Sequence, residues 1–321
     1  MLSTAQSFKA LVGAILLSLA GAVSATPLSD YNLILLGDLN ANSIHVYDRA
    51  FIRVDITGGG SEFRSRMDRS TRENSLEVAG DIRSSGVTVQ SGYMAVGGVN
   101  TAGNVNCNGN GLNRACVTTG TDLDTKADDL AARLYDDSLW LSSLGSNGDL
   151  FLADHNRKSF TYTGSDSVAV FNLAGTDLFG QNSNWSLNAG SAQTVIINVS
   201  GSSVFNRGGV NFNAGFGAQT GGNNIGASNI LWNFYEATSI DFGSTRFNGS
   251  VLAPYADIRM TNDFDGSVAA KSYTGAGQVH NYLFNGAGLS RPPVSEVPEP
   301  PALLLMLMGL GLLGLVRLRR S

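Results

Sequence analysis

Few residues of this chain have the types and the spacing that catalysis requires. The densest charged group is Asp257, Arg259, Asp263 and Asp265, which falls within one short stretch. Acids clustered on one face would suit cleavage of a polysaccharide. On a strand, alternation places Asp257 and Arg259 on the same side, where such a pair is typical of a solvent-facing surface. No serine lies in a Gly-x-Ser-x-Gly elbow. We therefore expect no catalytic residue and no enzymatic activity.

Candidate metal ligands are equally sparse. The histidines are far apart in the sequence: His45, His155 and His280. A zinc site needs clustered ligands, so a hydrogen-bonded structural role is expected for His280. Asp38, Asn40 and Asn42 alternate like the oxygens of a calcium loop, but Ser43 and Arg49 replace the glycine and the distal glutamate of an EF-hand. Turn formation is the favoured interpretation, and we predict no metal site and no cofactor.

The two cysteines are close in sequence, with a loop rich in glycine and asparagine between Cys107 and Cys116. In an oxidising compartment this spacing predicts a disulfide. Closing a loop of this size is expected to contribute about 2–3 kcal/mol.

The N-terminal segment, residues 1–25, has the three parts of a signal peptide. Lys9 gives a positive start, an apolar run follows, and small residues from Val23 to Ala25 suit a signal peptidase. The apolar run is too short for a membrane span. We predict cleavage between Ala25 and Thr26, which makes signal peptidase the first partner.

The C-terminal segment has a different order of features. A linker at 291–297 precedes the motif Val297, Pro298, Glu299 and Pro300, which is followed by an apolar helix at 301–316. Arg317, Arg319 and Arg320 then resist transfer across the bilayer and would remain on the cytoplasmic side. A glycine pattern within the apolar run, from Gly309 to Gly314, has dinucleotide-loop spacing but no preceding strand, so nucleotide binding is rejected.

This combination at 298–321 closely resembles the PEP-CTERM sorting signal. The resemblance implies recognition by exosortase, a membrane transpeptidase of Gram-negative bacteria that make exopolysaccharide. It also implies transient anchoring in the inner membrane through the tail, removal of the tail, and display on the outer surface or in the extracellular matrix.

The body of the chain, residues 26–290, is predicted to consist of short strands separated by turns. Of all residues in the full sequence only 15% are charged, the net charge is −5 and glycine occurs 39 times, a composition that favours strands and tight turns. The acidic balance disfavours nucleic acid as a partner. Strand-like runs begin at Tyr31, Gly92, Thr194 and Ile230.

Weak internal repetition indicates how these strands are arranged. The stretch from Asn248 to Pro254 is echoed seventeen positions later, from Asp265 to Lys271. Gly80-Asp81-Ile82 is similarly echoed by Gly98-Val99-Asn100. Recurrence near this length suits the coils of a parallel β-solenoid, although a β-sandwich with similarly spaced strands remains an alternative.

One segment interrupts the β pattern. At 122–144, Leu123, Ala127, Leu130, Leu134 and Leu141 have helical spacing. We predict an amphipathic helix that lies along the solenoid with its apolar side buried. Its start can be capped by Thr121 or Asp122 and its end by Gly145.

The body also resembles the choice-of-anchor A domain. The resemblance is carried, in the family's order, by stretches that begin at Tyr31, Ala95, Val195, Ile230, Gly249, Ala270 and Gln278. Arg53 and Val54 depart from it, where another Gly-Gly turn is expected. The family implies a right-handed parallel β-helix over 26–290 with one flanking helix, and an adhesive role without enzymatic activity.

The sequence therefore favours an all-β, non-catalytic surface protein that adheres to exopolysaccharide or another surface glycan. A polysaccharide-processing β-helix enzyme is the alternative from a different class. Ice binding is a further alternative, but Thr88, Thr118, Thr119 and Thr161 do not form an even ladder.

Overall fold

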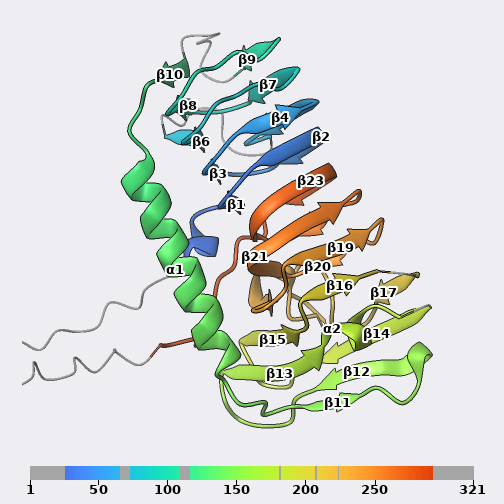
Figure 1. The fold of residues 1–321 in the computed structure, drawn as a ribbon. Helices are drawn as coiled ribbons and strands as arrows, with labels where there is room; N and C mark the ends of the chain where they lie inside the picture. The colour runs from blue at the N-terminus through green and yellow to red at the C-terminus, as the bar shows by residue number, and fades with distance from the viewer. Residues whose placement is uncertain are drawn as a thin grey trace, which may run out of the picture. The chain divides into compact units, whose positions relative to one another are not determined.

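The computed structural model describes residues 26–291, apart from 66–72, 109–115, 181, 207 and 223. Most of its strands form one sheet of 19 strands, and four others form a smaller sheet. Within these described residues, the strands of every pair run parallel except β11 and β12. This pairing makes the fold a parallel β-solenoid and excludes the sandwich alternative (Figure 1).

The described residues start in the middle of the solenoid and first build one half of it. A short 3-10 turn, Pro27–Ser29, precedes these strands. They are β1 (Leu33–Leu35), β2 (Leu39–Val46), β3 (Ala50–Ile52), β4 (Ile56–Gly58), β5 (Gly60–Phe63), β6 (Asn74–Val78), β7 (Gly86–Val89), β8 (Tyr93–Val96), β9 (Val105–Cys107) and β10 (Val117–Thr119).

Helix α1 (Asp124–Ser142) then carries the chain along the flank to the opposite end, as Figure 1 shows. The second half is built from there back towards the middle, with 3-10 turns at His155–Arg157 and Ala227–Asn229. Its elements are β11 (Asp149–Phe151), β12 (Lys158–Thr161), β13 (Val168–Ala174), α2 (Gly175–Leu178), β14 (Ser183–Asn188), β15 (Thr194–Ser200), β16 (Ser203–Phe205), β17 (Val210–Phe212), β18 (Ile230–Asn233), β19 (Ser239–Gly243), β20 (Phe247–Asn248), β21 (Ser250–Met260), β22 (Phe264–Asp265) and β23 (Val268–His280).

The two halves meet where the first and last strands pair. Leu33 of β1 lies beside Val268 of β23, and Leu39 of β2 lies beside Tyr273 of the same strand. On its other side β23 pairs with β21. The last strand of the domain therefore joins both halves.

The sequence echo of seventeen residues corresponds to one coil of this solenoid. Val251 pairs with Val268 and Ala253 with Ala270, and Ser250 accepts a hydrogen bond from the backbone of Ser267, seventeen residues on. Equivalent side chains stack from coil to coil because each coil repeats the previous backbone path. In the second half this produces a column of aromatic rings inside the coils, which includes the edge-to-face pair of Phe247 and Phe264.

Helix α1 covers one face of the solenoid, so the strands beneath it are buried on both sides. Leu130 and Leu134 are 6% and 0% exposed and pack against Ile196 of β15 and Leu252 of β21. The next residue of β15, Ile197, faces the interior of the coils. The apolar side of the helix thus has a flat apolar partner, as predicted for this segment.

Two asparagines fasten the helix to this face, and a third extends their ladder to the next coil. Asn198 donates to the backbone oxygen of Leu141 at 2.8 Å, and Asn233 donates to that of Ser138 at 2.9 Å. Asn233 also donates to Asn198 at 2.9 Å, and Asn198 to Asn172 at 3.1 Å. This ladder gives the buried amides of Asn198 and Asn233 hydrogen-bond partners on the helix and on a neighbouring coil.

The ends of α1 differ from the prediction. Leu123 occupies the N-cap position without a side-chain cap, and Ser143 rather than Gly145 is the C-cap. Asp122 lies one residue too early to cap the helix, and it accepts the backbone N–H of Asp124 at 3.2 Å instead. Thr121 does not cap it either.

No helix within the described ranges combines the length and the apolar character that a membrane span needs. The predicted signal helix at 1–25 and the predicted transmembrane helix at 301–316 both lie outside these ranges.

Candidate functional site

The predicted sorting residues lie outside the part of the chain that the structure describes. They are Val297, Pro298, Glu299, Pro300, Arg317, Arg319 and Arg320, together with Ala25 at the expected cleavage point. Thr26 is described, and its hydroxyl accepts the backbone N–H of Leu28 at 3.4 Å. The structure joins Cys107 to Cys116 through a disulfide, with their Cα atoms 6.1 Å apart.

Asp257 and Arg259 share the outer side of β21, and each is paired with a neighbouring coil. Arg259 donates to Asp241 at 3.2 Å, while Lys271 and Ser272 donate to Asp257 at 3.1 and 2.7 Å. These partners hold the side chains on an open surface. They do not converge on a cavity in which a substrate bond would be held.

Asp265 is separated from this surface and is almost completely buried. Arg246 donates to both of its carboxylate oxygens at 2.8 Å, and His280 contacts it through Nδ1 at 2.6 Å. Burial alone would raise the pKa of Asp265, but the hydrogen bonds from His280 and Arg246 outweigh it and lower that pKa. Asp263 instead accepts the backbone N–H of Gln278 at 2.9 Å. Both acids therefore have structural partners.

Asp38 stands at a turn and begins a ladder of such turns, whereas Asn40 and Asn42 lie in strand β2 and not in the predicted turn. Asp38 accepts the backbone N–H of Asp55 at 3.0 Å, Asp55 accepts that of Asp81 at 2.8 Å, and Asp81 accepts that of Val99 at 2.7 Å. Each aspartate thereby holds the turn of the next coil. Among the described residues, no group of three histidines, cysteines or acids is arranged to hold a metal ion.

The outward rows of the main sheet mix charge and polarity. One row contains Asp241, Arg259, Thr274, Asn40 and Thr57 on successive strands. In another, Thr88 lies between Glu62 and Asn106. Threonines do not stack on each other in these two rows, in agreement with their irregular spacing in the sequence.

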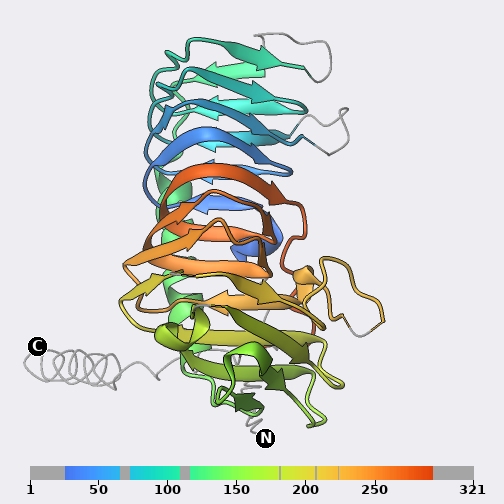
Figure 2. The ribbon, with the colours of Figure 1, turned by 90° about the vertical axis from the view of Figure 1, so that its right-hand side faces the viewer.

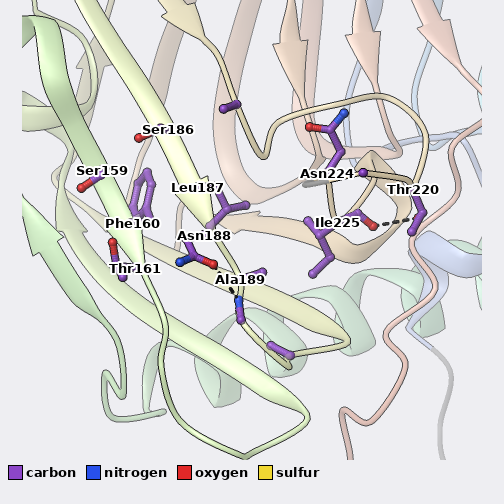
Figure 3. Close-up of a pocket in the computed structure, with 14 residues that line it drawn as sticks. Ser159, Phe160, Thr161, Ser186, Leu187, Asn188, Ala189, Thr220, Asn224 and Ile225 are labelled. Carbon is purple, nitrogen blue, oxygen red and sulfur yellow. Dashed lines mark hydrogen bonds between the residues drawn. The ribbon is translucent and has the colours of Figure 1, made fainter.

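A groove of about 590 Å³ opens beside the smaller sheet (Figure 3). Ser159 and Thr161 of β12 stand next to Ser186 and Asn188 of β14, in register. The opposite wall comes from the segment 214–225. Hydroxyl and amide groups therefore converge on a concave surface, and none of the side chains that line it is charged.

The segment 214–225 is held by its own contacts. Asn224 accepts the backbone N–H of Gly215 at 3.1 Å, and Thr220 donates to the backbone oxygen of Ile225 at 2.8 Å. Gly215 has a positive φ of 90°, and a Cβ there would lie 1.8 Å from the backbone oxygen of Leu187. The close approach of this wall to β14 thus requires glycine.

The sequence did not indicate this groove. Its lining comes from two strands and a separate loop, and serine, threonine and asparagine are common throughout the chain. The sequence feature that could have pointed to one wall of the groove is the run rich in glycine and asparagine at 213–226, which indicates a long loop between strands.

Two family matches cover most of the chain. Residues 24–281 match the family described as "Putative Ice-binding-like adhesive domain", and residues 296–320 match the PEP-CTERM protein-sorting motif. The comparison with curated proteins gives no match.

Three solved ice-binding proteins share 13% identity with the chain. They come from the Antarctic ascomycete Antarctomyces psychrotrophicus, an Antarctic Flavobacteriaceae bacterium and an Antarctic biological consortium. The matches cover 80%, 77% and 80% of this chain and 96%, 80% and 88% of the other chains, with TM-scores of 0.31, 0.30 and 0.29. At this identity and TM-score, the similarity does not indicate which ligand this chain binds. By the match over 24–281, the chain belongs to the ice-binding-like adhesive domain family and carries a PEP-CTERM sorting motif at its C-terminal end.

Proposed function

We propose that this chain is a secreted bacterial surface protein whose β-solenoid adheres to an uncharged glycan without catalysis. The observation that carries the proposal is the groove between β12, β14 and the segment 214–225. Its hydroxyls and amides can both donate to and accept from sugar hydroxyls. A neutral lining suits a neutral ligand because no buried charge has to be compensated.

The test is a glycan array probed with residues 26–291 and with a Thr161→Trp variant. Thr161 lies on the outer side of β12 and lines the groove. The larger side chain should block the groove and remove glycan binding while the fold is retained. Binding by the variant equal to that of the parent protein would place the glycan elsewhere.

The proposal includes sorting by exosortase in a Gram-negative bacterium. Support comes from the PEP-CTERM match at 296–320. Pro298 and Pro300 disfavour helix and leave the motif extended for a peptidase. A tag placed after Ser321 should be absent from the mature surface protein in wild-type cells and present in cells without exosortase. Retention of the tag in both strains would identify an ordinary anchor.

Ice binding and polysaccharide cleavage are the competing functions. The mixed row of Asp241, Arg259 and Thr274 weighs against ice, because the charged members interrupt the regular spacing that an ice-binding face needs. The paired acids weigh against cleavage. We expect no thermal hysteresis and no release of reducing ends from polysaccharides, and either activity would replace this proposal.

A further inference from the structure

A second groove of about 610 Å³ lies close to the first. It is lined by Asn211 and Phe212 of β17, by Phe216, and by Ser244 and Arg246 near β20. We infer that this second groove continues the glycan site, so that the protein binds an internal stretch of an uncharged polysaccharide across both grooves. The inference rests on the proposed function and names the class of ligand, a polymer rather than a single sugar or a chain end.

The strands that line the two grooves are adjacent. Asn211 and Phe212 of β17 pair with Asn184 and Trp185 of β14, and Ser186, the next residue of β14, lines the first groove. Asn211 donates to Asn184 at 3.0 Å across the two strands. The outward polar side chains of these adjacent strands, which are about 4.8 Å apart, thus form a short polar strip from Ser186 and Asn184 of β14 to Asn211 of β17.

One loop contributes to both grooves. Ala214, Thr220 and Asn224 line the first groove, whereas Phe216 and Ala218 line the second. Figure 2 shows this segment standing out from the coils. A chain molecule that follows the strip from β14 to β17 would therefore contact the loop from both sides.

The second groove adds groups suited to a sugar ring. Phe212 is partly exposed and offers an apolar face, while Ser244 is exposed and offers a hydroxyl. Arg246 has a side chain that is 55% exposed, and the bidentate contact with Asp265 fixes its orientation. A planar, pre-oriented guanidinium can donate to adjacent hydroxyls with little loss of side-chain entropy.

The charges of this groove favour a neutral ligand. The carboxylate of Asp265 compensates the charge of Arg246, and the carboxylate of Asp263 is also close enough to raise the pKa of that guanidinium. An acidic sugar would meet this extra negative charge. The buried side-chain oxygen of Asn248, a further lining residue, has no hydrogen-bond partner among the described residues, so the groove retains capacity for a hydroxyl donor.

The test is affinity as a function of chain length, measured with the secreted protein. The probes are cello-, laminari- and maltooligosaccharides of two to ten units, with a uronic acid series for comparison. Affinity for one neutral series should rise by about tenfold or more once the chain reaches both grooves. Preference for the uronic acid series would overturn the inference.

Two blocking variants and a control separate the inference from the proposed function. Ser244→Trp should remove the length-dependent gain and leave binding of short chains unchanged, whereas Thr161→Trp should remove both. Thr88→Trp places the same side chain on β7, away from both grooves, and should change neither.

Three results would contradict one or both claims. Unchanged length dependence in Ser244→Trp would overturn the inference and leave the proposed function standing. Unchanged binding in Thr161→Trp, or no binding of any series by the parent protein, would overturn both.

Discussion

At the scale of single residues, Asp265 shows how this protein buries a charge in the wall of a β-solenoid. Its side chain is 3% exposed, and Arg246 and His280 contact it from the preceding segment and the following coil. A buried carboxylate without such partners would be strongly destabilising. The same contacts hold the pKa of Asp265 below its usual value despite burial.

This lowered pKa predicts a specific pH dependence. The stabilisation is present above the unfolded pKa of about 3.9 and is lost as the pH falls through the lower folded pKa. Asp265→Asn should reduce the free energy of unfolding at pH 7 by about 2–3 kcal/mol, because Arg246 loses its charged partner. The loss is limited to this range because Arg246 is half exposed and can partly rehydrate. Urea denaturation at pH 7 and pH 3 should show that the difference from the parent protein shrinks in acid.

Asp257→Asn provides the matched control for this change. Its ion pair with Lys271 is about half exposed on both sides, so its loss should cost less than about 1 kcal/mol. Equal destabilisation by the two substitutions would show that burial does not determine the contribution of Asp265.

Glycines at the coil corners form a second constraint at this scale. A Cβ on Gly80 would lie 2.3 Å from the backbone oxygen of Val54, which occupies the corner of the neighbouring coil. Val54 is 41% exposed and stands where the sequence led us to expect glycine. The corner tolerates this valine side chain because it points outwards, while the glycine stacked on it is required.

Gly80→Ala should therefore destabilise the domain, whereas Gly60→Ala should not. We expect a loss of about 1–3 kcal/mol for Gly80→Ala, because the corner must move to relieve the contact. A Cβ on Gly60 has no neighbour within 4 Å. Thermal unfolding of both variants would test the difference, and an equal loss at both positions would show that the close contact at Gly80 is not its cause.

At the scale of elements, the helix joins segments that are distant in the sequence. Ser138 donates to Asn233 at 2.7 Å, and Asn198 donates to the backbone of Leu141. The amphipathic spacing of the helix was readable because it is local. The asparagine ladder was not readable, because loops of unequal length separate its members.

We predict that Leu130→Asp combined with Leu134→Asp abolishes soluble folding. Each leucine contributes roughly 1.5–3 kcal/mol through burial, and two charges facing the sheet add a further cost. Expression and circular dichroism of the double variant would measure the effect. Leu139→Asp is the control, since Leu139 is 70% exposed on the same helix and its replacement should leave the fold intact.

The sequence predicted the coil repeat of the solenoid, but it predicted neither the order of the coils nor the grooves. The sequence repeat that relates Asn248 to Asp265 gives the length of one coil, because neighbouring coils share a backbone path. The order of the coils left no such signal, because the pairing of Leu33 with Val268 depends on the whole chain. Ligand grooves were also invisible, since Ser186 and Thr220 meet only after folding.

At the scale of the whole molecule, the position of β23 determines whether the two halves form one body. It pairs with β1 and β2 on one side and with β21 on the other. Backbone N–H and C=O groups along its length therefore have partners in both halves. Without it, each half would expose an unpaired sheet edge.

A chain that ends at Ser267 should therefore fail to form a stable domain, although it keeps most of the coils. A chain that ends at Arg291 keeps β23 and should fold. Limited proteolysis and circular dichroism of the two proteins would separate the cases. A stable, protease-resistant protein ending at Ser267 would show that the halves do not need this strand.

The central position of β23 also has a mechanical consequence for an adhesive domain. Tension applied through the C-terminal end of the domain first loads the hydrogen bonds of Ala287 and Gly288 with the second half. It then enters the sheet at β23 rather than at either terminal coil. The load is shared between hydrogen bonds to both neighbours, so they must give way together before the strand moves. Once it is withdrawn, the solenoid separates at its centre instead of fraying from an end. Detachment under flow would then be a single abrupt event with a force threshold, and not a gradual loss of coils.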